Sequence, residues 1–301
     1  MTLSGPSLAF FDLPWAQLLV NGLALGSLYA LTAFGIVLIY KTTQVITFAQ
    51  GETAMFSTFV AFTLLTGLQL PFPLAFVLTL VFAGLFGALI ERVVMRRMST
   101  TSILNPVIVT VGLSLILLGV AGWIWGYEIR TFPAPVEGPP FRIGTVVVSQ
   151  LNALILAVTL VLMAVFFAFF RYSTLGIAMR AVAQNRLGAQ LMGINIGRIN
   201  ALGWGLGTAM GAVTGMLIAP LNYLDPGMMG DVALKAFAAA VLGGLTSLPG
   251  AVVGGLLLGI MDSVVGFEVP ELRNTIAFGL IVLVLVMRPG GLLGRHEIKK
   301  V

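Results

Sequence analysis

The sequence predicts an all-α, polytopic membrane protein with about eight to nine transmembrane helices, and three observations support this fold class. Of the 301 residues, 58% are apolar and only 9% are charged. The mean hydropathy of +1.06 also exceeds that of soluble chains, in which about a quarter of the residues are charged. Long apolar stretches recur at the length that crosses a bilayer, and basic residues gather in alternate connections between them.

The composition also excludes several classes of protein. So apolar a chain is neither an ordinary cytosolic enzyme nor a nucleic-acid binder. There is no cysteine and a single histidine, His296, so a zinc site or a Ser-His-Asp triad has almost no residues to use. Neither Lys41 nor Lys235 follows a glycine, so the chain lacks a phosphate-binding P-loop. We therefore expect a non-catalytic chain that binds no metal or cofactor.

The lengths of the apolar stretches predict which segments cross the membrane. A helix needs about 20 apolar residues to cross about 30 Å of hydrocarbon. Stretches of about this length occupy 15–40, 46–66, 72–94, 103–126, 150–170, 199–220 and 271–288, and two further apolar pieces, 231–245 and 248–266, form a hairpin. No basic residue precedes Lys41, so the first stretch lacks the start of a signal peptide and should persist as a helix. We expect residues 1–301 to form a single transmembrane domain.

The distribution of positive charge predicts the orientation. If successive spans alternate and the N-terminus lies outside, twelve of the sixteen basic residues fall on inner segments, as the positive-inside rule requires. These twelve are Lys41, Arg92, Arg96, Arg97, Arg171, Arg180, Arg186, Arg198, Arg288, Arg295, Lys299 and Lys300. We therefore expect the N-terminus outside and the C-terminus inside.

The longest outer connection, 127–149, contains Pro133, Pro135, Pro139 and Pro140. This density of proline favours an extended strap. The strap is either a simple connector or a docking surface for an external partner.

Glycines recur at four-residue spacing. Gly203, Gly207, Gly211 and Gly215 form a ridge on one span, and the pairs Gly22/Gly26, Gly250/Gly254 and Gly255/Gly259 repeat the spacing. Such ridges allow helix backbones to approach closely in lipid. We favour packing inside the bundle over a dimer face or a sliding gate.

The segments 84–94 and 255–265 resemble each other and contain Glu91 and Asp262 at equivalent positions. Under the predicted topology they run in opposite directions, as inverted repeats do in transporters.

The first candidate functional segment is 47–52, which ends in Gln50, Gly51 and Glu52. A carboxylate at membrane depth is costly unless it faces protein or a watery cavity. The glycine can permit a helix break that exposes backbone groups to a polar solute. The alternative is that Glu52 lies at the interface and caps a helix start.

The second candidate is the first leg of the 231–266 hairpin. Residues 231–245 extend only about 22 Å as a helix, so this leg either crosses the bilayer or turns back at Gly243 and Gly244. Lys235 either pairs with Asp231 at i,i+4 spacing or lines the solute path.

The third candidate is the inner segment 171–198, which has four arginines, no acidic residue and apolar side chains at helical spacing. Ser173 is a candidate N-cap. An amphipathic, cationic segment of this kind either lies on anionic lipid or inserts into a groove of a partner protein.

These segments, taken together, resemble a known family. The chain resembles the permease subunit of bacterial branched-chain amino-acid ABC importers, of the Liv type, in order along nearly its full length. The matching stretches are 21–31, 47–52, 171–176, 192–195, 235–244, 247–250 and 295–301.

The resemblance implies a bacterial inner-membrane protein with four partners. They are a second permease subunit, two cytoplasmic ATPases that carry ATP and Mg²⁺, and an external solute-binding protein. It makes 174–193 the ATPase-coupling segment, which favours partner docking over lipid binding there. Gln50, Gly51, Glu52, Lys235, Gly243 and Gly244 are then the candidate pathway residues. The coupling residues are Leu175, Gly176, Met179, Arg180, Ala183, Gln184, Arg186, Gly188, Met192 and Gly193.

Two positions depart from the family pattern. Gln50 replaces a usual histidine, which removes a titratable group and bears on the substrate, and Gln184 replaces a frequent glutamate. The alternatives are an importer of the same build for urea, short amides or another small polar solute, a stand-alone transporter coupled to ions through Glu52 and Asp262, and a membrane scaffold or receptor.

Overall fold

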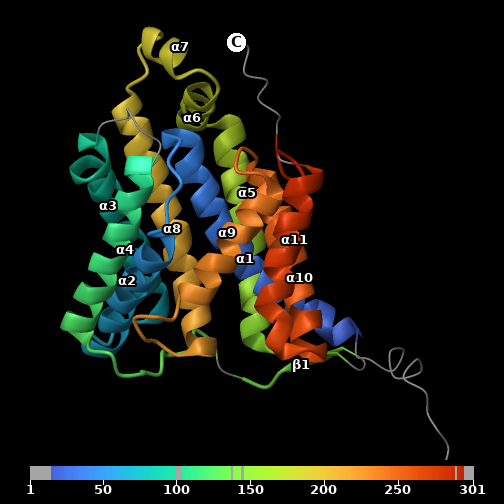
Figure 1. Ribbon diagram of the computed structural model, residues 1–301. Helices are drawn as coiled ribbons and strands as arrows, with labels where there is room; N and C mark the ends of the chain where they lie inside the picture. The colour runs from blue at the N-terminus through green and yellow to red at the C-terminus, as the bar shows by residue number, and fades with distance from the viewer. Residues whose placement is uncertain (1–14, 99–103, 137, 144–145, 289, 295–301) are drawn as a thin grey trace, which may run out of the picture.

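The computed structural model describes residues 15–98, 104–136, 138–143, 146–288 and 290–294, which form a bundle of helices (Figure 1). Within these residues, six helices are long and apolar enough to cross a membrane. They are α1 (Trp15–Thr43), α3 (Phe72–Val93), α4 (Leu104–Trp125), α5 (Gln150–Tyr172), α8 (Ile196–Asn222) and α10 (Leu248–Glu268). The prediction of a mostly helical, polytopic membrane protein is confirmed.

The remaining predicted spans form shorter helices. They are α2 (Gln50–Phe62), which continues as the π-turn η1 (Thr63–Gly67), α9 (Gly230–Gly243) and α11 (Arg273–Met287). Short 3-10 turns, η2 (Met95–Arg97) and η3 (Pro270–Leu272), follow α3 and precede α11.

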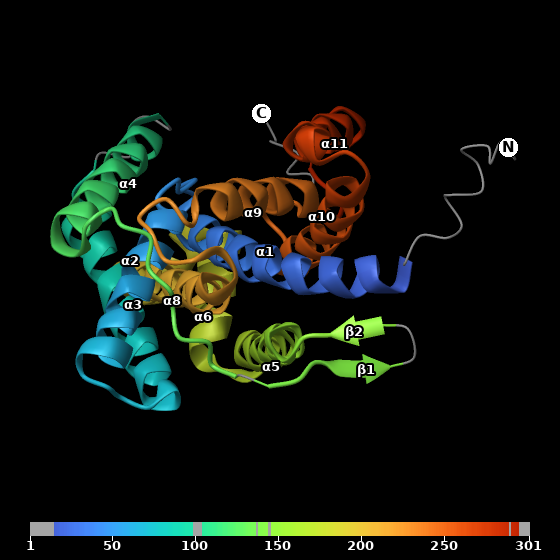
Figure 2. The same cartoon turned by 90° about the horizontal axis from the view of Figure 1, so that it is seen from below.

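Burial separates central helices from peripheral ones. In the most apolar 18-residue stretch of each helix, 89% of α1 and 78% of α8 is buried inside the bundle. The corresponding shares for α4 and α5 are 22% and 17%. Apolar surface on α4 and α5 therefore faces lipid or a partner protein. Figure 2 shows α4 and α11 at the two ends of one side of the molecule, with α9 between them.

Glycine contacts explain how the central helices pack. A Cβ on Gly207 would lie 2.9 Å from the carbonyl oxygen of Gly35 in α1, and one on Gly211 would lie 3.1 Å from the Cβ of Ala54 in α2. The α8 ridge thus packs inside the bundle, which confirms that interpretation of the spacing. On the other side of α1, Gly26 lies against Leu256 of α10.

The described residues of the connection 127–149 form no helix, as its prolines predict, but they include a small antiparallel ribbon. β1 (Phe141–Ile143) pairs with β2 (Val146–Val148), and Phe141 is opposite Val148. The fold is therefore not all-α in the strict sense. The Gln17 side chain of α1 exchanges two hydrogen bonds of 2.8 Å with the Val147 backbone, and this pairing fixes the ribbon against the bundle.

The inner segment forms two helices instead of one. These are α6 (Thr174–Gln184) and α7 (Arg186–Leu191). Ser173 caps α6 by accepting a hydrogen bond from the Gly176 amide at 2.9 Å, as predicted. Asn185 has an extended backbone and caps α7 in the same way, through the Gly188 amide at 2.8 Å. This second cap produces the bend between α6 and α7.

The described parts of the predicted inner segments lie at one end of the bundle, which we call the α6–α7 end (Figure 1). Arg295, Lys299 and Lys300 lie outside the described residues. There the guanidinium of Arg96, after α3, donates to the carbonyl oxygen of Gly197 in α8 at 2.6 Å. At the opposite end, Arg130 of the strap pairs with Leu224 after α8. The alternation of segments between two ends is thus as predicted.

Candidate functional site

The helix α2 begins inside the bundle. After α1 the chain runs without helical structure from 44 to 49, and the Nε2 atom of Gln50 then donates to the carbonyl oxygen of Gly207 at 2.8 Å. Gly207 lies eleven residues into α8, which is about 16 Å along the helix axis. The N-terminus of α2 is therefore about half a bilayer deep, as in the discontinuous helices of transporters.

The predicted break is present, but Gly51 does not form it. The irregular backbone comprises the six residues before α2, and Gly51 lies within the helix. A Cβ on Gly51 would be only 2.8 Å from the Cβ of Ala233 in α9. The glycine therefore allows α2 and α9 to approach each other, which corrects the expectation that it opens the backbone.

A pocket of about 260 Å³ lies beside this helix start, between α1, α2 and α9. Its wall is mainly apolar, with Ile36 of α1, Phe48 before α2, and Leu234 and Phe237 of α9, and also includes Thr47, Gly230 and Ala233. Gln50, which has an amide side chain, and Glu52, which has an acidic one, also line it. Apolar walls with a few converging polar groups are typical of small-molecule sites.

Two oxygen atoms at this pocket lack partners. Oε1 of Gln50 and Oε2 of Glu52 are buried and accept no hydrogen bond from any residue that the structure describes. Leaving a buried acceptor unpaired costs about 1–3 kcal/mol, and more for a charged group. A ligand with hydrogen-bond donors that reaches these buried oxygens would relieve this cost.

Glu52 also lies in the first turn of α2, where a carboxylate interacts favourably with the helix N-terminus. The N-cap residue is Ala49, which offers no side-chain cap. Glu52 therefore lies at a helix start, as the alternative interpretation expected. Its Oε2 atom nevertheless remains unpaired among the described residues.

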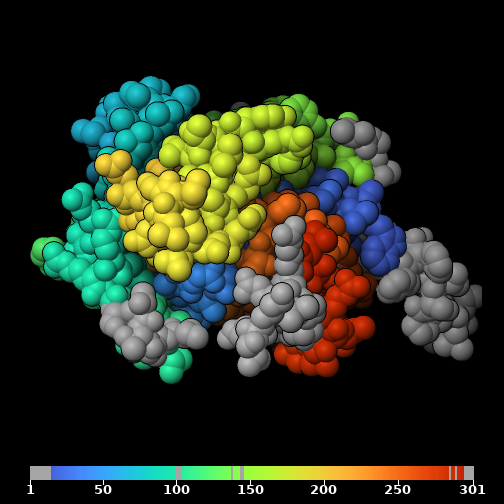
Figure 3. All heavy atoms as spheres, turned by 90° about the horizontal axis from the view of Figure 1, so that it is seen from above, coloured from blue at the N-terminus to red at the C-terminus, as the bar shows by residue number. Residues whose placement is uncertain are grey.

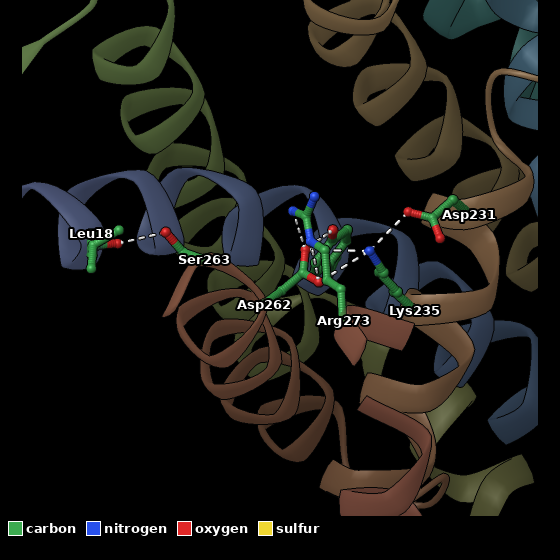
Figure 4. Close-up of polar contacts among 7 residues, drawn as sticks. Leu18, Asp231, Lys235, Asp262, Ser263 and Arg273 are labelled. Carbon is green, nitrogen blue, oxygen red and sulfur yellow. Dashed lines mark hydrogen bonds and ion pairs between the residues drawn. The ribbon is translucent and has the colours of Figure 1, made fainter. Parts of the chain in front are cut away.

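Lys235 belongs to a buried ion cluster instead of the pocket wall (Figure 4). Its ammonium lies 2.8 Å from Asp231 and 3.1 Å from Asp262. Asp262 is fully buried and also accepts hydrogen bonds from Arg273, at 2.7 and 2.6 Å, and from the Tyr29 hydroxyl, at 2.8 Å. We call these five residues the Asp262 cluster.

The Asp262 cluster joins α1, α9, α10 and α11. Its two carboxylates balance one ammonium and one guanidinium, so the formal charge of the group is zero, and each buried charge has a close partner. The predicted pairing of Lys235 with Asp231 is confirmed. The roles of Tyr29, Asp262 and Arg273 could not be recognised from local spacing, because their partners come from distant parts of the chain.

Gly243 and Gly244 do end α9, as predicted. Gly243 is the last helical residue, and Gly244 has a φ of +103°, a conformation that favours glycine. The carbonyl oxygens of Leu242 and Gly243 accept hydrogen bonds of 2.8 and 3.0 Å from the amides of Leu292 and Leu293. The carbonyl end of α9 is thus closed by the segment after α11, and it is not the open polar feature that we expected.

The predicted coupling residues divide by exposure. Gly176 and Met179 are buried against the bundle, Ala183 and Gly188 are half-buried, and Leu175, Arg180, Gln184, Arg186, Met192 and Gly193 are exposed. Sequence reasoning missed Leu187 and Leu191, which are 68% and 79% exposed beside Met192 at 83%. These three residues form an apolar tip on α7, and apolar tips of this kind are typical of protein contacts.

Comparison with known proteins identifies relatives over nearly the whole chain. Residues 18–285 match the family described as "Branched-chain amino acid transport system / permease component". The chain is 37% identical to the high-affinity branched-chain amino acid transport system permease protein BraD of Pseudomonas aeruginosa, over 95% of this chain and 98% of that protein.

Two further relatives agree. Identity to the corresponding permease protein LivH of Escherichia coli K12 is 35%, over 95% of this chain and 97% of that protein. Identity to the probable branched-chain amino acid transport permease protein LivH of Methanocaldococcus jannaschii is 30%, over 92% and 90%.

Proposed function

This chain belongs to the family of branched-chain amino-acid transport permease components, and we propose from that premise that it is a membrane subunit of an ATP-driven importer of branched-chain amino acids. The similarity to BraD over 95% of the chain supports this most directly. The chain has no P-loop, so ATP hydrolysis falls to two partner ATPases and this subunit performs no catalysis.

We place the α6–α7 end in the cytoplasm of a bacterial cell, so the N-terminus is outside and the C-terminus inside. Twelve of the sixteen basic residues belong to segments assigned to this side, which the positive-inside rule favours. The opposite end, with the strap and its β-ribbon, then faces the external binding protein that delivers the solute.

The ATPases dock on α7 in this proposal. Its tip presents Leu187, Leu191 and Met192 to solvent, and apolar helix residues of this kind fit a partner's groove. The buried residues of α6, Gly176 and Met179, instead hold that helix against the bundle. The coupling segment 174–193 thus has one helix for anchoring and one for docking.

The solute path follows the pocket at the start of α2. An amino acid offers an ammonium group to the unpaired oxygens of Glu52 and Gln50, and a branched apolar side chain to Ile36, Leu234 and Phe237. Phe48 and Leu234 are 44% and 50% exposed, so one side of the path remains for the second permease subunit to complete. Lys235, Gly243 and Gly244 contribute indirectly, because they fix α9 as a wall of the pocket.

The chain also offers a route from docking to transport. The helix α7 leads through four residues into α8, and α8 binds Gln50 through the Gly207 carbonyl. Closure of the ATPases would move α7, tilt α8 and displace the start of α2. Small rigid-body shifts of packed helices can produce such switching.

Uptake by the complete complex in proteoliposomes tests this function. We expect ATP-dependent accumulation of labelled leucine that valine and isoleucine inhibit and urea does not. Failure of leucine to compete for uptake would contradict the substrate class and favour urea, short amides or another polar solute. Accumulation by the purified chain alone under a Na⁺ or H⁺ gradient would contradict the ATP-driven mechanism.

A further inference from the structure

Three cavities adjoin one another near the α6–α7 end. A polar cavity of about 670 Å³ shares Lys41, Arg180, Leu248 and Pro249 with a smaller one of about 190 Å³. The smaller cavity shares Phe170, Leu248 and Pro249 with an apolar one of about 410 Å³ between α5 and α10. The shared walls place the three cavities next to one another, and we call them together the groove.

The chemistry of this groove changes along its length. At the α6–α7 end, the charged side chains are Lys41 of α1 and Arg180 of α6, and no carboxylate is found among the described residues that line any of the three cavities. Further along, the walls are aromatic and aliphatic, with Phe166 of α5 and Val252 and Val253 of α10. The groove therefore combines a cationic mouth with an apolar channel.

We propose that this groove binds one phospholipid with an anionic headgroup. The headgroup phosphate lies between Lys41 and Arg180, and an acyl chain lies between α5 and α10. Basic pockets between helices on the cytoplasmic side bind such headgroups, and long basic side chains place their charge at that depth. The helix α5 is the least buried of the six long helices, so a lipid can reach the channel from the bilayer.

The site gives α6 and α7 different partners. Figure 3 shows both helices lying across the α6–α7 end of the molecule. Arg180 and Met179 of α6 line the groove, whereas the exposed tip of α7 does not. A lipid that contacts α1, α6 and α10 would hold α6 in place while α7 engages a protein. This inference does not depend on the transported solute.

Native mass spectrometry of the delipidated full chain in detergent tests the proposal. The chain is titrated with phosphatidylglycerol, phosphatidylcholine or inorganic phosphate. We expect phosphatidylglycerol to bind in a one-to-one adduct and phosphatidylcholine to bind at least about fivefold more weakly, because it lacks the net negative charge. Inorganic phosphate should neither bind nor compete, since it cannot occupy the apolar channel.

Variants separate the two parts of the groove. Arg180→Gln should weaken the adduct by about fivefold, Arg180→Lys should largely retain it, and Val253→Trp, which fills the channel, should also weaken it. Arg92→Gln removes a charge that is also exposed but lies outside the groove, and it is the matched control. Unchanged thermal unfolding of each variant shows that the fold persists.

Three results would overturn the inference. They are equal binding of the two lipids, an adduct that Arg180→Gln leaves unchanged, and competition by inorganic phosphate, which would indicate a simple anion site. A fourth result, protection of Arg180 from chemical modification by the ATPases and not by lipid, would assign the mouth to protein docking and would also overturn the inference.

Discussion

Glu52 and Asp262 are both acidic residues on helices within the bundle, but their surroundings are opposite. Every oxygen of Asp262 is bound by Arg273, Lys235 or Tyr29, whereas Oε2 of Glu52 has no partner among the described residues. Satisfied buried charges stabilise one arrangement of helices. The roles that we propose are therefore a structural one for Asp262 and contact with the solute for Glu52.

Glu52→Gln should therefore lower leucine uptake about tenfold or more while the complex still assembles. The substitution keeps the size of the side chain and removes the charge that attracts the ammonium group, a loss of at least about 1.4 kcal/mol. Uptake by purified complexes in vesicles measures it. Glu268→Gln, at an exposed position at the end of α10, is the control. Uptake equal to that of the wild type would leave Glu52 only its role at the helix start.

Asp262→Asn should destabilise the chain by about 3–5 kcal/mol, because Lys235 and Arg273 then lose their buried counter-charge. Asp231→Asn should cost less than about 1 kcal/mol, since the Asp231 side chain is 59% exposed and solvent screens its charge. Thermal unfolding in detergent compares the two variants. Similar losses of stability for both would show that Asp262 is not the centre of the cluster.

The sequence reveals only part of this residue-scale chemistry. Lys235 and Asp231 are four residues apart on one helix, so their pairing follows from helical geometry. Tyr29 and Asp262 are 233 residues apart, and no local pattern joins them. Glu52 could be recognised as a functional candidate because a carboxylate at membrane depth is expensive, whereas its unpaired oxygen could be seen only in the structure.

At the scale of helices, the length of apolar stretches predicts the spans well but not where a helix begins inside one. The stretch 46–66 is long enough to cross a membrane, yet α2 starts only at Gln50. That start is set by contacts of Gln50 with α8 and of Gly51 with α9. Such tertiary contacts override local propensity. The bend at Asn185 likewise depends on a side-chain cap within an otherwise helical pattern.

Gly211→Leu should disrupt the packing of α2 on α8. A Cβ at this position would lie 2.9 Å from Nε2 of Gln50 and 3.1 Å from the Cβ of Ala54, so a larger side chain must separate the helices at a cost of about 1–3 kcal/mol. Gly119→Leu in α4 is the matched control, since no described atom lies within 4 Å of its Cβ. Thermal unfolding measures both, and equal stability of the two variants would contradict the packing role.

Leu191→Ser should weaken co-purification of the ATPases while the chain still inserts and folds. Leu191 is 79% exposed at the tip of α7, so its loss removes contact area from a partner's groove and leaves the bundle core intact. Gln190→Ala, at the neighbouring exposed position, serves as the control. Undiminished recovery of ATPases with Leu191→Ser would argue against docking on α7.

At the scale of the whole molecule, α3 and α10 support the proposed inverted repeat. α3 runs toward the α6–α7 end and α10 runs away from it. The equivalent acids Glu91 and Asp262 are both buried, and each binds an arginine that follows its helix, Arg96 or Arg273, at 2.6 Å. Each of the two related halves would therefore contain one stabilising acid–arginine pair. The two pairs would lie toward opposite faces of the membrane.

The proposed coupling from α7 to the start of α2 requires that α7 face the cytoplasm. This orientation can be tested with single cysteines, because the chain has none of its own. A single Leu187→Cys on α7 should react with a membrane-impermeant maleimide only when the cytoplasmic face is accessible. Val136→Cys, in the strap at the opposite end, should react from outside in intact cells. The reverse labelling pattern would place α7 outside the cell, away from ATP-hydrolysing partners, and the coupling route from α7 through α8 to Gln50 would have no source of energy.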